Sequence, residues 1–160
     1  MRYLMRISLV LAIAFLYTGA GIKETKRTEG IQPGNLAPKI NLQGVDIKRN
    51  AYVLVQFWAA YDPQSRLENT RMCHVISRSG IENLQIVSIA FDENSAVFQG
   101  IVKTDQLDEA SQWNEADGIH SSLFKNYRLE AGFGNYLLDS DGVIVAKNLS
   151  PAEVLKKVIQ

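Results

Sequence analysis

The sequence predicts an α/β fold, a three-layer sandwich in which helices flank a central mixed β-sheet and a β-hairpin and a helix end the chain. Two apolar runs, 53–58 and 84–91, have the length and the β-branched or aromatic content of buried strands. The segment between them, 63–79, carries the start and stop signals of a helix. A strand, a helix and a second strand in this order favour a parallel βαβ unit.

The N-terminal part of the chain is predicted to precede the domain. Residues 1–20 combine Arg2 and Arg6 with an uncharged run and small residues up to Ala20, which is typical of a cleaved signal peptide. An uncut membrane anchor or a buried helix remains the alternative, although the run is short for a membrane span. Residues 21–33 are polar and predict a linker, so we expect the domain to cover 34–160.

The first elements of the domain are a short edge strand and the helix that follows the central strand. Ile40 and Leu42 alternate with polar neighbours and indicate an edge strand, with its turn at 43–45. Asp62 is the expected N-cap of the helix, and Pro63 is its first residue. The apolar face of this helix is expected to consist of Leu67, Met72, Val75 and Ile76, and Gly80 is a natural stop.

The remaining elements follow from local signals. We expect a helix over 95–103, a short strand plus loop with a packed Trp113 within 104–118, and a helix over 121–127. An Asp-Gly pair between the apolar runs 136–139 and 143–146 predicts a hairpin. Ser150 and Glu153 form a predicted capping box at the start of the last helix. The inward side chains are expected to be Val97, Phe98, Ile101 and Val102 in 95–103, Leu123 and Phe124 in 121–127, and Val154, Leu155, Val158 and Ile159 in the last helix.

The segment 53–68 resembles the active-site segment of the thioredoxin family. It is VLVQFWAAYDPQSRLE, and the exported thiol-disulfide oxidoreductase branch of that superfamily, which also includes redoxins and thiol-specific antioxidant enzymes, has F-W-A-x-W-C-P-x-C-R-x-E. The matching residues are Phe57, Trp58, Ala59, Pro63, Arg66 and Glu68, and Gly34, Ala37, Pro38 and Ile40 match the segment that opens the family's domain. The resemblance implies a thioredoxin-like fold from about residue 33 to the end of the chain.

The residues that carry the family's chemistry differ in this chain. Asp62 and Ser65 stand where the resemblance places the two active-site cysteines, and Phe133 stands where it places a cis-proline. Because a cis bond before a non-proline residue costs roughly 2.5–4 kcal/mol, we expect a trans bond and a reshaped loop at Phe133. We call these three positions the vestigial site. Because all three depart from the family's pattern, we expect no catalytic residue there.

Cys73 is the sole cysteine of the chain, so no intramolecular disulfide can form. It lies about three turns into the helix, far from the N-terminal dipole that activates thiols, and we expect a buried apolar side chain. The alternative is a thiol-disulfide oxidoreductase or monothiol peroxidase acting through Cys73, which requires an exposed thiol with a lowered pKa.

The sequence therefore favours a redox-inactive binding or accessory module that is exported to the periplasm or cell envelope. The resemblance implies that a protein or peptide partner binds at a surface that we call the rim, which consists of Trp58, Tyr61, Asp62, Pro63 and Phe133. A subunit of an envelope assembly, tethered to the membrane through the N-terminus, is a further alternative.

Other ligand classes have little support in the sequence. The net charge is zero and the basic residues are scattered, which argues against nucleic acid. His74 and His120 are the only histidines, and no further ligands stand at metal-binding spacing. The sequence contains no phosphate-binding loop, so it indicates no cofactor. The acidic loop residues are expected on a solvated face: Asp92, Glu93, Asp105, Asp108 and Glu109.

Overall fold

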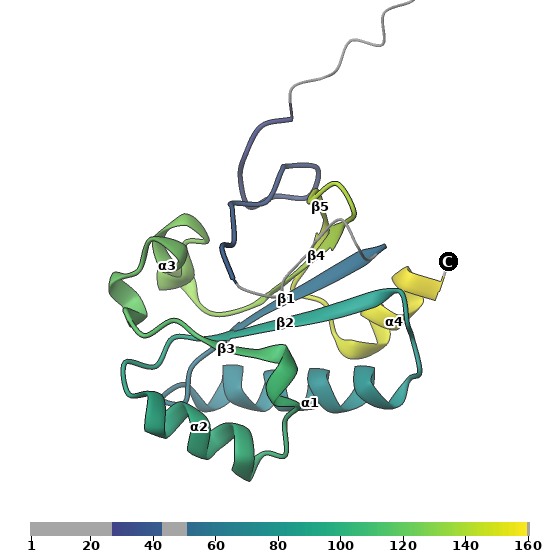
Figure 1. Cartoon of the computed structure of the whole chain (residues 1–160). Helices are drawn as coiled ribbons and strands as arrows, with labels where there is room; N and C mark the ends of the chain where they lie inside the picture. Colours follow the sequence, from purple (N-terminus) through teal and green to yellow (C-terminus); the bar gives the residue numbers. More distant parts are fainter. Residues whose placement is uncertain (1–26, 43–50, 160) are drawn as a thin grey trace, which may run out of the picture.

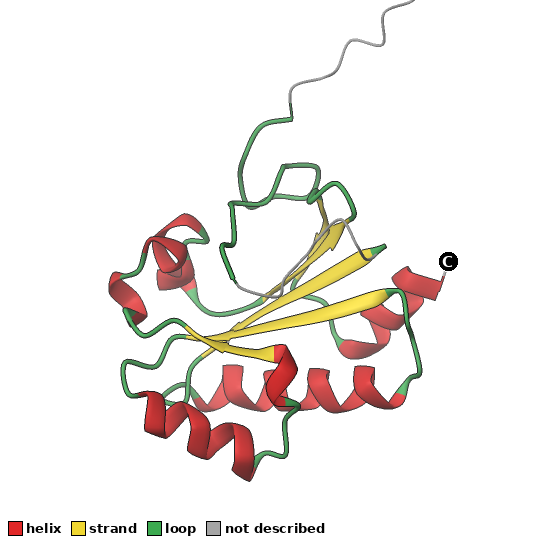
Figure 2. Cartoon of the chain, viewed as in Figure 1, coloured by secondary structure: helices red, strands yellow, loops and turns green. Residues whose placement is uncertain are grey.

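The computed structural model describes residues 27–42 and 51–159, which contain a five-stranded mixed sheet with helices on both faces (Figures 1 and 2). The strands lie in the order β3-β2-β1-β4-β5, with β1 and β2 parallel and β1 and β4 antiparallel. The strands are β1 (Tyr52–Trp58), β2 (Leu84–Ala90), β3 (Gln112–Asn114), β4 (Asn135–Asp139) and β5 (Ile144–Lys147). The α/β sandwich and the parallel βαβ unit predicted from the sequence are confirmed.

The helices are arranged in two unequal layers. They are α1 (Pro63–Arg78), α2 (Ser95–Thr104), α3 (Ser122–Asn126) and α4 (Pro151–Ile159), with single turns of 3-10 helix at η2 (Glu109–Ser111), η3 (Gly118–His120) and η4 (Leu129–Ala131). Helices α1, α2 and α4 cover one face of the sheet, and α3 with η4 covers the other (Figure 1). Alternation along β1 divides the core between them, since Val55 and Phe57 face α3 whereas Leu54 and Trp58 face α1.

The helix ends that the sequence predicts are confirmed. The carboxylate of Asp62 accepts from the backbone N–H groups of Gln64 and Ser65 at the start of α1. At the start of α4, Glu153 accepts from the backbone N–H and the hydroxyl of Ser150, as a capping box requires. Both devices depend on residues within one turn, so local sequence is enough to predict them.

Two helices bury different faces from those predicted. In α1 the residues that face the sheet are Ser65, Asn69, Met72, Cys73 and Ile76, which follow helical spacing, whereas Leu67 and Val75 are exposed. Polar side chains therefore occupy part of the inward face that we expected to be apolar. Val97 in α2 and Ile159 in α4 are exposed as well, although their neighbours Val102 and Val158 are buried as expected.

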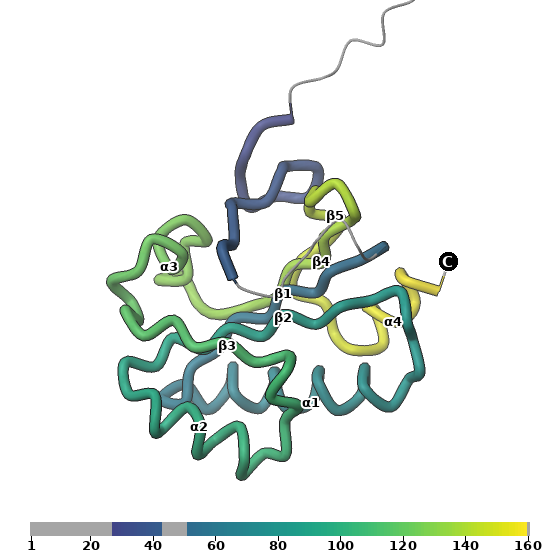
Figure 3. Tube along the Cα trace, in the orientation of Figure 1, coloured from purple at the N-terminus to yellow at the C-terminus, as the bar shows by residue number. Residues whose placement is uncertain are grey.

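Residues 34–37 pack on the β4–β5 hairpin (Figure 3). Gly34 N–H donates to the carbonyl of Ile144 and Ala37 N–H to that of Gly142, at 2.8 and 3.0 Å. The predicted edge strand at Ile40 and Leu42 is wrong for the residues described there, because both side chains pack on the core without joining a ladder. Contacts to the domain already begin within the predicted linker, where Ile31 packs against the α3-side core.

The predicted leader at 1–20, the first part of the predicted linker at 21–26 and the predicted turn at 43–45 lie outside the described residues. Within 27–42 and 51–159, no helix has the length and apolar character needed to cross a membrane.

Candidate functional site

The vestigial site lies at the end of the sheet where β1 leads into α1 (Figure 1). The turn between them is held by Ser65, whose hydroxyl accepts from the buried N–H of Ala59 at 3.2 Å and donates to the carbonyl of Asp62 at 3.2 Å. Asp62 is the N-cap of α1 and is engaged by two backbone N–H groups. Both substituted positions therefore have structural roles, and each satisfies backbone groups that the turn would otherwise leave without partners.

The loop that contains Phe133 faces this turn from the other side. No cis peptide bond occurs among the described residues, and Gly132 adopts a φ of +123°, a conformation that favours glycine. The Gly134 carbonyl accepts from Phe57 N–H at 2.9 Å, which fixes the loop against β1. On the other flank, Gly132 N–H donates to the carbonyl of Leu129 at 2.9 Å. Phe133 is thus held on both flanks, at the place where the resemblance implied a cis-proline.

An aromatic cluster connects Phe133 to the rim. Its ring lies 6.3 Å from that of Tyr61 and 5.9 Å from that of Phe91, between ring centroids. Phe124 of α3 completes the cluster at 6.2 Å from Phe133. Tyr61 is 61% exposed, so an aromatic face remains open to solvent above a packed aromatic base.

Trp58 does not belong to the accessible part of the rim. Its side chain is completely buried between β1, α1 and α2, where it packs with Cys73, Val102 and Phe98. The exposed part of the rim accordingly consists of Tyr61, Asp62, Pro63 and Phe133, of which Asp62 and Phe133 are half-buried.

Cys73 lies deep in the same layer, with 4% of its surface exposed. Its sulfur is 3.5 Å from Asn69 Oδ1 and 3.5 Å from Gln112 Nε2, within a buried polar group that also includes the hydroxyl of Ser88. Burial raises the pKa of the thiol to about 11, and the hydrogen bond from Gln112 offsets only part of this effect. This environment is the opposite of the one that activates a nucleophilic cysteine.

Asp92 is buried at the site, although the sequence predicted a solvated position for it. It follows β2 directly, is 5% exposed, and both of its carboxylate oxygens lie 3.0 Å from the N–H of Ala60. Burial raises the pKa of Asp92, and the hydrogen bond from Ala60 opposes that shift. Its place after a parallel strand was the available signal, because functional groups gather at the carboxyl ends of such strands.

A groove runs beside Tyr61 and over Asp92. Its volume is about 580 Å³, and its walls come from the β1–α1 turn, the end of β2, α2 and η3. The side chains of Tyr61, Val97 and Ile119 are exposed along it. Burial raises the pKa of Tyr61, and the carboxylates of Asp92, Asp62 and Glu93 raise it further.

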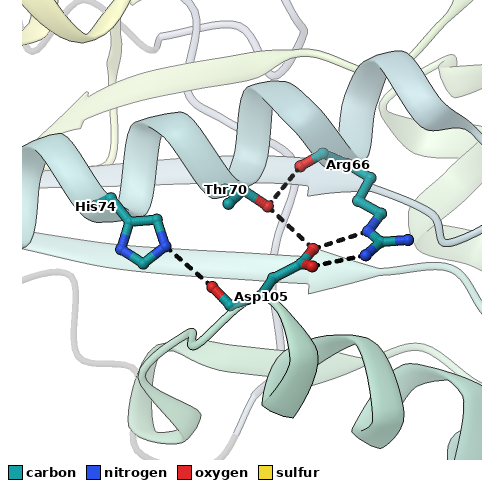
Figure 4. Close-up of polar contacts among 4 residues, drawn as sticks. All are labelled: Arg66, Thr70, His74 and Asp105. Carbon is teal, nitrogen blue, oxygen red and sulfur yellow. Dashed lines mark hydrogen bonds and ion pairs between the residues drawn. The ribbon is translucent and has the colours of Figure 1, made fainter.

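A polar clasp holds α2 against α1 next to the site (Figure 4). Arg66 donates from Nε and Nη2 to the two carboxylate oxygens of Asp105 at 2.7 and 2.6 Å, and the Thr70 hydroxyl donates to Asp105 at 3.2 Å. One turn further along α1, His74 Nε2 lies 2.9 Å from the backbone carbonyl of Asp105. Arg66, a residue of the family motif, therefore has a structural partner here. The solvated position predicted for Asp105 is wrong, because its side chain is only 12% exposed within this pair.

The described part of the chain contains no group of three or more histidine, cysteine, aspartate or glutamate side chains that could hold a metal ion. Glu68, the last residue of the motif, accepts a hydrogen bond from Gln64 on the same helix at 2.6 Å.

Comparisons with solved structures agree with the fold and the motif. A thioredoxin-like protein from Parabacteroides distasonis is 36% identical, with a TM-score of 0.79 over 84% of this chain and 100% of that one. The C-terminal domain of a protein assigned as a thiol-disulfide oxidoreductase, from Bacteroides thetaiotaomicron, is 27% identical, with a TM-score of 0.68 over 81% of this chain and 95% of that one. No protein-family model matches the chain, and no curated protein matches it significantly.

The strand order of the sheet and the position of the vestigial site at the start of α1 place this chain in the class of thioredoxin-fold proteins. The identity and coverage of the first of these structures show the family as well: this chain belongs to the thioredoxin-like proteins.

Proposed function

We propose that this chain is an exported thioredoxin-like binding module that has no thiol-disulfide exchange activity and holds an extended polypeptide at the exposed part of the rim. The proposal rests on the residues of α1, which has no accessible thiol at the position where the family carries its attacking cysteine. A capping carboxylate, Asp62, occupies the position of the attacking thiol, while the one cysteine is buried with a pKa of about 11. A carboxylate at a helix N-terminus stabilises the helix but cannot attack a disulfide.

Binding is supported by what the site retains. The rim keeps an exposed aromatic side chain, Tyr61, above an anchored loop at Phe133, and aromatic residues are frequent anchors of protein interfaces. Loss of catalysis leaves such a surface intact, because binding and chemistry depend on different groups.

Export rests on residues 1–20, whose charge and apolar pattern is that of a secretion signal. A retained N-terminal helix would make the chain a tethered subunit of an envelope assembly. Mass determination of the protein purified from its native envelope separates these cases: loss of the first twenty residues supports the cleaved form, and an intact N-terminus supports the tether.

The exchange activity is tested by measuring disulfide reduction with residues 21–160, which include every described residue, beside the Cys73→Ser variant. We expect background rates from both proteins. Turnover that disappears in Cys73→Ser would overturn the proposal and assign the reaction to Cys73, in spite of its burial.

The binding activity is tested with an alkylated, unfolded polypeptide that offers no reactive thiol. We expect Tyr61→Ser to weaken binding about tenfold, as truncation of an interface anchor commonly does. Ile159→Ser is the matched control, since Ile159 is as exposed but lies at the C-terminal end of α4. Equal loss in both variants, or no binding by the wild type, would contradict polypeptide binding at the rim.

A further inference from the structure

The groove beside Tyr61 combines apolar walls with a buried carboxylate at its base. Val97 and Ile119, from α2 and η3, are 45% and 48% exposed, so the walls of the groove present apolar surface to a ligand. Asp92 is nine-tenths buried and lines the same groove. A surface of this kind favours a ligand that is apolar along its length and positively charged at one end.

The carboxylate of Asp92 has acceptor capacity beyond the one donor that the described residues provide. The N–H of Ala60 contacts both oxygens, whereas an ionised carboxylate can accept about four hydrogen bonds. A buried anion is favourable only when it is paired or well hydrogen-bonded. Asp92 is therefore suited to receive further donors from a ligand that enters the groove.

Glu93 adds a second negative charge at the edge of the groove. Its Cγ lies so close to Gly118 that a Cβ at that position would meet it at 3.1 Å, and Gly118 has a φ of +53°. The glycine in η3 thus gives the Glu93 side chain its place beside the groove. Asp92 and Glu93 both line the groove. None of the described residues that line it is a lysine or arginine, so the lining carries a net negative charge.

We propose that this groove receives a lysine or arginine side chain of the bound polypeptide, with the aliphatic stem on Val97 and Ile119, the cation near the Tyr61 ring, and the charged end paired with Asp92. The inference rests on the proposed function and gives it a specificity. Long cationic side chains lay their methylene groups along apolar surfaces while the charge reaches a polar partner, and cations are attracted to aromatic faces.

Two small probes test the groove without requiring a whole polypeptide. N-acetyl-lysine methylamide and N-acetyl-norleucine methylamide have similar stems, but only the first carries an ammonium group. Their affinities for residues 21–160 are measured by NMR from the shifts of the backbone amides of Ala60, Asp92 and Val97. We expect the lysine probe to bind about tenfold more tightly, the size of a charge-assisted hydrogen bond in a partly buried site.

Three variants test which residue causes the preference for the lysine probe over the norleucine probe. Asp92→Asn keeps an oxygen for the Ala60 N–H but removes the charge, and we expect it to reduce the preference for lysine to about twofold or less. Glu82→Gln removes one charge at an exposed position remote from the groove and is expected to leave the preference unchanged. Val97→Ser is expected to weaken both probes alike, because it removes wall area that the two stems share.

Equal affinity of the two probes for the wild type would overturn the inference, and so would an unchanged preference in Asp92→Asn. The wild-type comparison does not depend on the folding of any variant. Failure of the probes to discriminate would leave polypeptide binding at the rim as a separate question. A protein that binds the lysine probe but no unfolded polypeptide would contradict the proposed function and leave the cation site standing.

Discussion

Cys73 illustrates how one side chain's surroundings decide its chemistry. At a pKa of about 11, only about 0.1% of the thiol is ionised at pH 8, and burial blocks the approach of a reagent. We predict that an aromatic disulfide reagent at pH 8 reacts at least about 100-fold more slowly with the native protein than with the protein in denaturant. Similar rates in the two states would mean that Cys73 is accessible and would restore the monothiol alternative.

The raised pKa of Asp92 predicts that this carboxyl changes the stability of the protein with pH. Its carboxyl has a raised pKa in the folded protein, so it binds a proton more tightly there than in the unfolded chain, where its ordinary value is 3.8. Its favourable contribution is therefore complete below that ordinary value and is lost as the pH rises through the raised one. At neutral pH the ionised carboxylate is therefore expected to lower stability, and its position in the lining of a groove favours a role in binding.

We predict that Asp92→Asn raises the Tm at pH 7 and that its advantage over the wild type shrinks as the pH is lowered toward 4. Thermal unfolding between pH 4 and pH 7 measures this difference. Glu93→Gln, at the exposed neighbouring position, is the control and should change the Tm little across the range. A lower Tm for Asp92→Asn at pH 7 would assign the carboxylate to the stability of the β1–α1 turn instead.

At the scale of elements, the clasp between α1 and α2 is a polar contact that holds α2 beside the groove. The fork from Arg66 lowers the pKa of Asp105, and Thr70 and His74 add smaller effects in the same direction. The clasp therefore stabilises the fold above the carboxyl's ordinary value of 3.8, and this contribution is lost as the pH falls through the lowered folded value.

We predict that Asp105→Asn lowers the free energy of unfolding at pH 7 by about 1–3 kcal/mol, because it breaks a half-buried, charge-assisted pair. Denaturant unfolding at pH 7 and at pH 3 measures the loss, which should be smaller at pH 3. Asp141→Asn, which removes an exposed pair with Arg27, is the control and should cost less than 1 kcal/mol. Equal losses in the two variants would show that the clasp has no special role.

Local signals in the sequence were sufficient to predict most helices and strands, but not to predict which face of each helix is buried. The caps at Asp62 and Ser150 depend on neighbours within one turn, and both are present. The inward face of α1 depends on how the helix rotates on the sheet, and a buried polar residue, Asn69, fits only because Ser88 and Gln112 lie opposite it. Such partners are distant in sequence, so the exposure of Leu67 was not predictable.

At the scale of the whole molecule, the vestigial site was only partly predictable for the same reason. Motif spacing placed Asp62 and Phe133 on opposite sides of one site, and the structure brings Tyr61 and Phe133 together. The burial of Trp58 and Asp92 could not be read from the motif, because each depends on how α1, α2 and the end of β2 pack. Sequence thus predicted the frame of the site but not its open surface.

The N-terminal boundary of the domain is a property of the whole fold, since it depends on packing against a hairpin at the far end of the chain. Residues 27–33 contribute the Ile31 side chain to the core and a hydrogen bond from Leu36 N–H to the carbonyl of Thr28 at 3.0 Å. A linker would contribute neither. The cost of ordering the segment opposes these gains, so the net effect should be modest.

We predict that residues 34–160 are less stable than residues 27–160 by about 1–2 kcal/mol, the size expected for one partly buried isoleucine and one or two hydrogen bonds after ordering. Denaturant unfolding of the two fragments measures the difference. Ile31→Ser in the longer fragment should reproduce about half of it, because it removes the apolar contact and keeps the backbone bonds, whereas Gln32→Ser, at an exposed position, should have little effect. Equal stability of the two fragments would mean that 27–33 acts as the linker that its polar composition indicates.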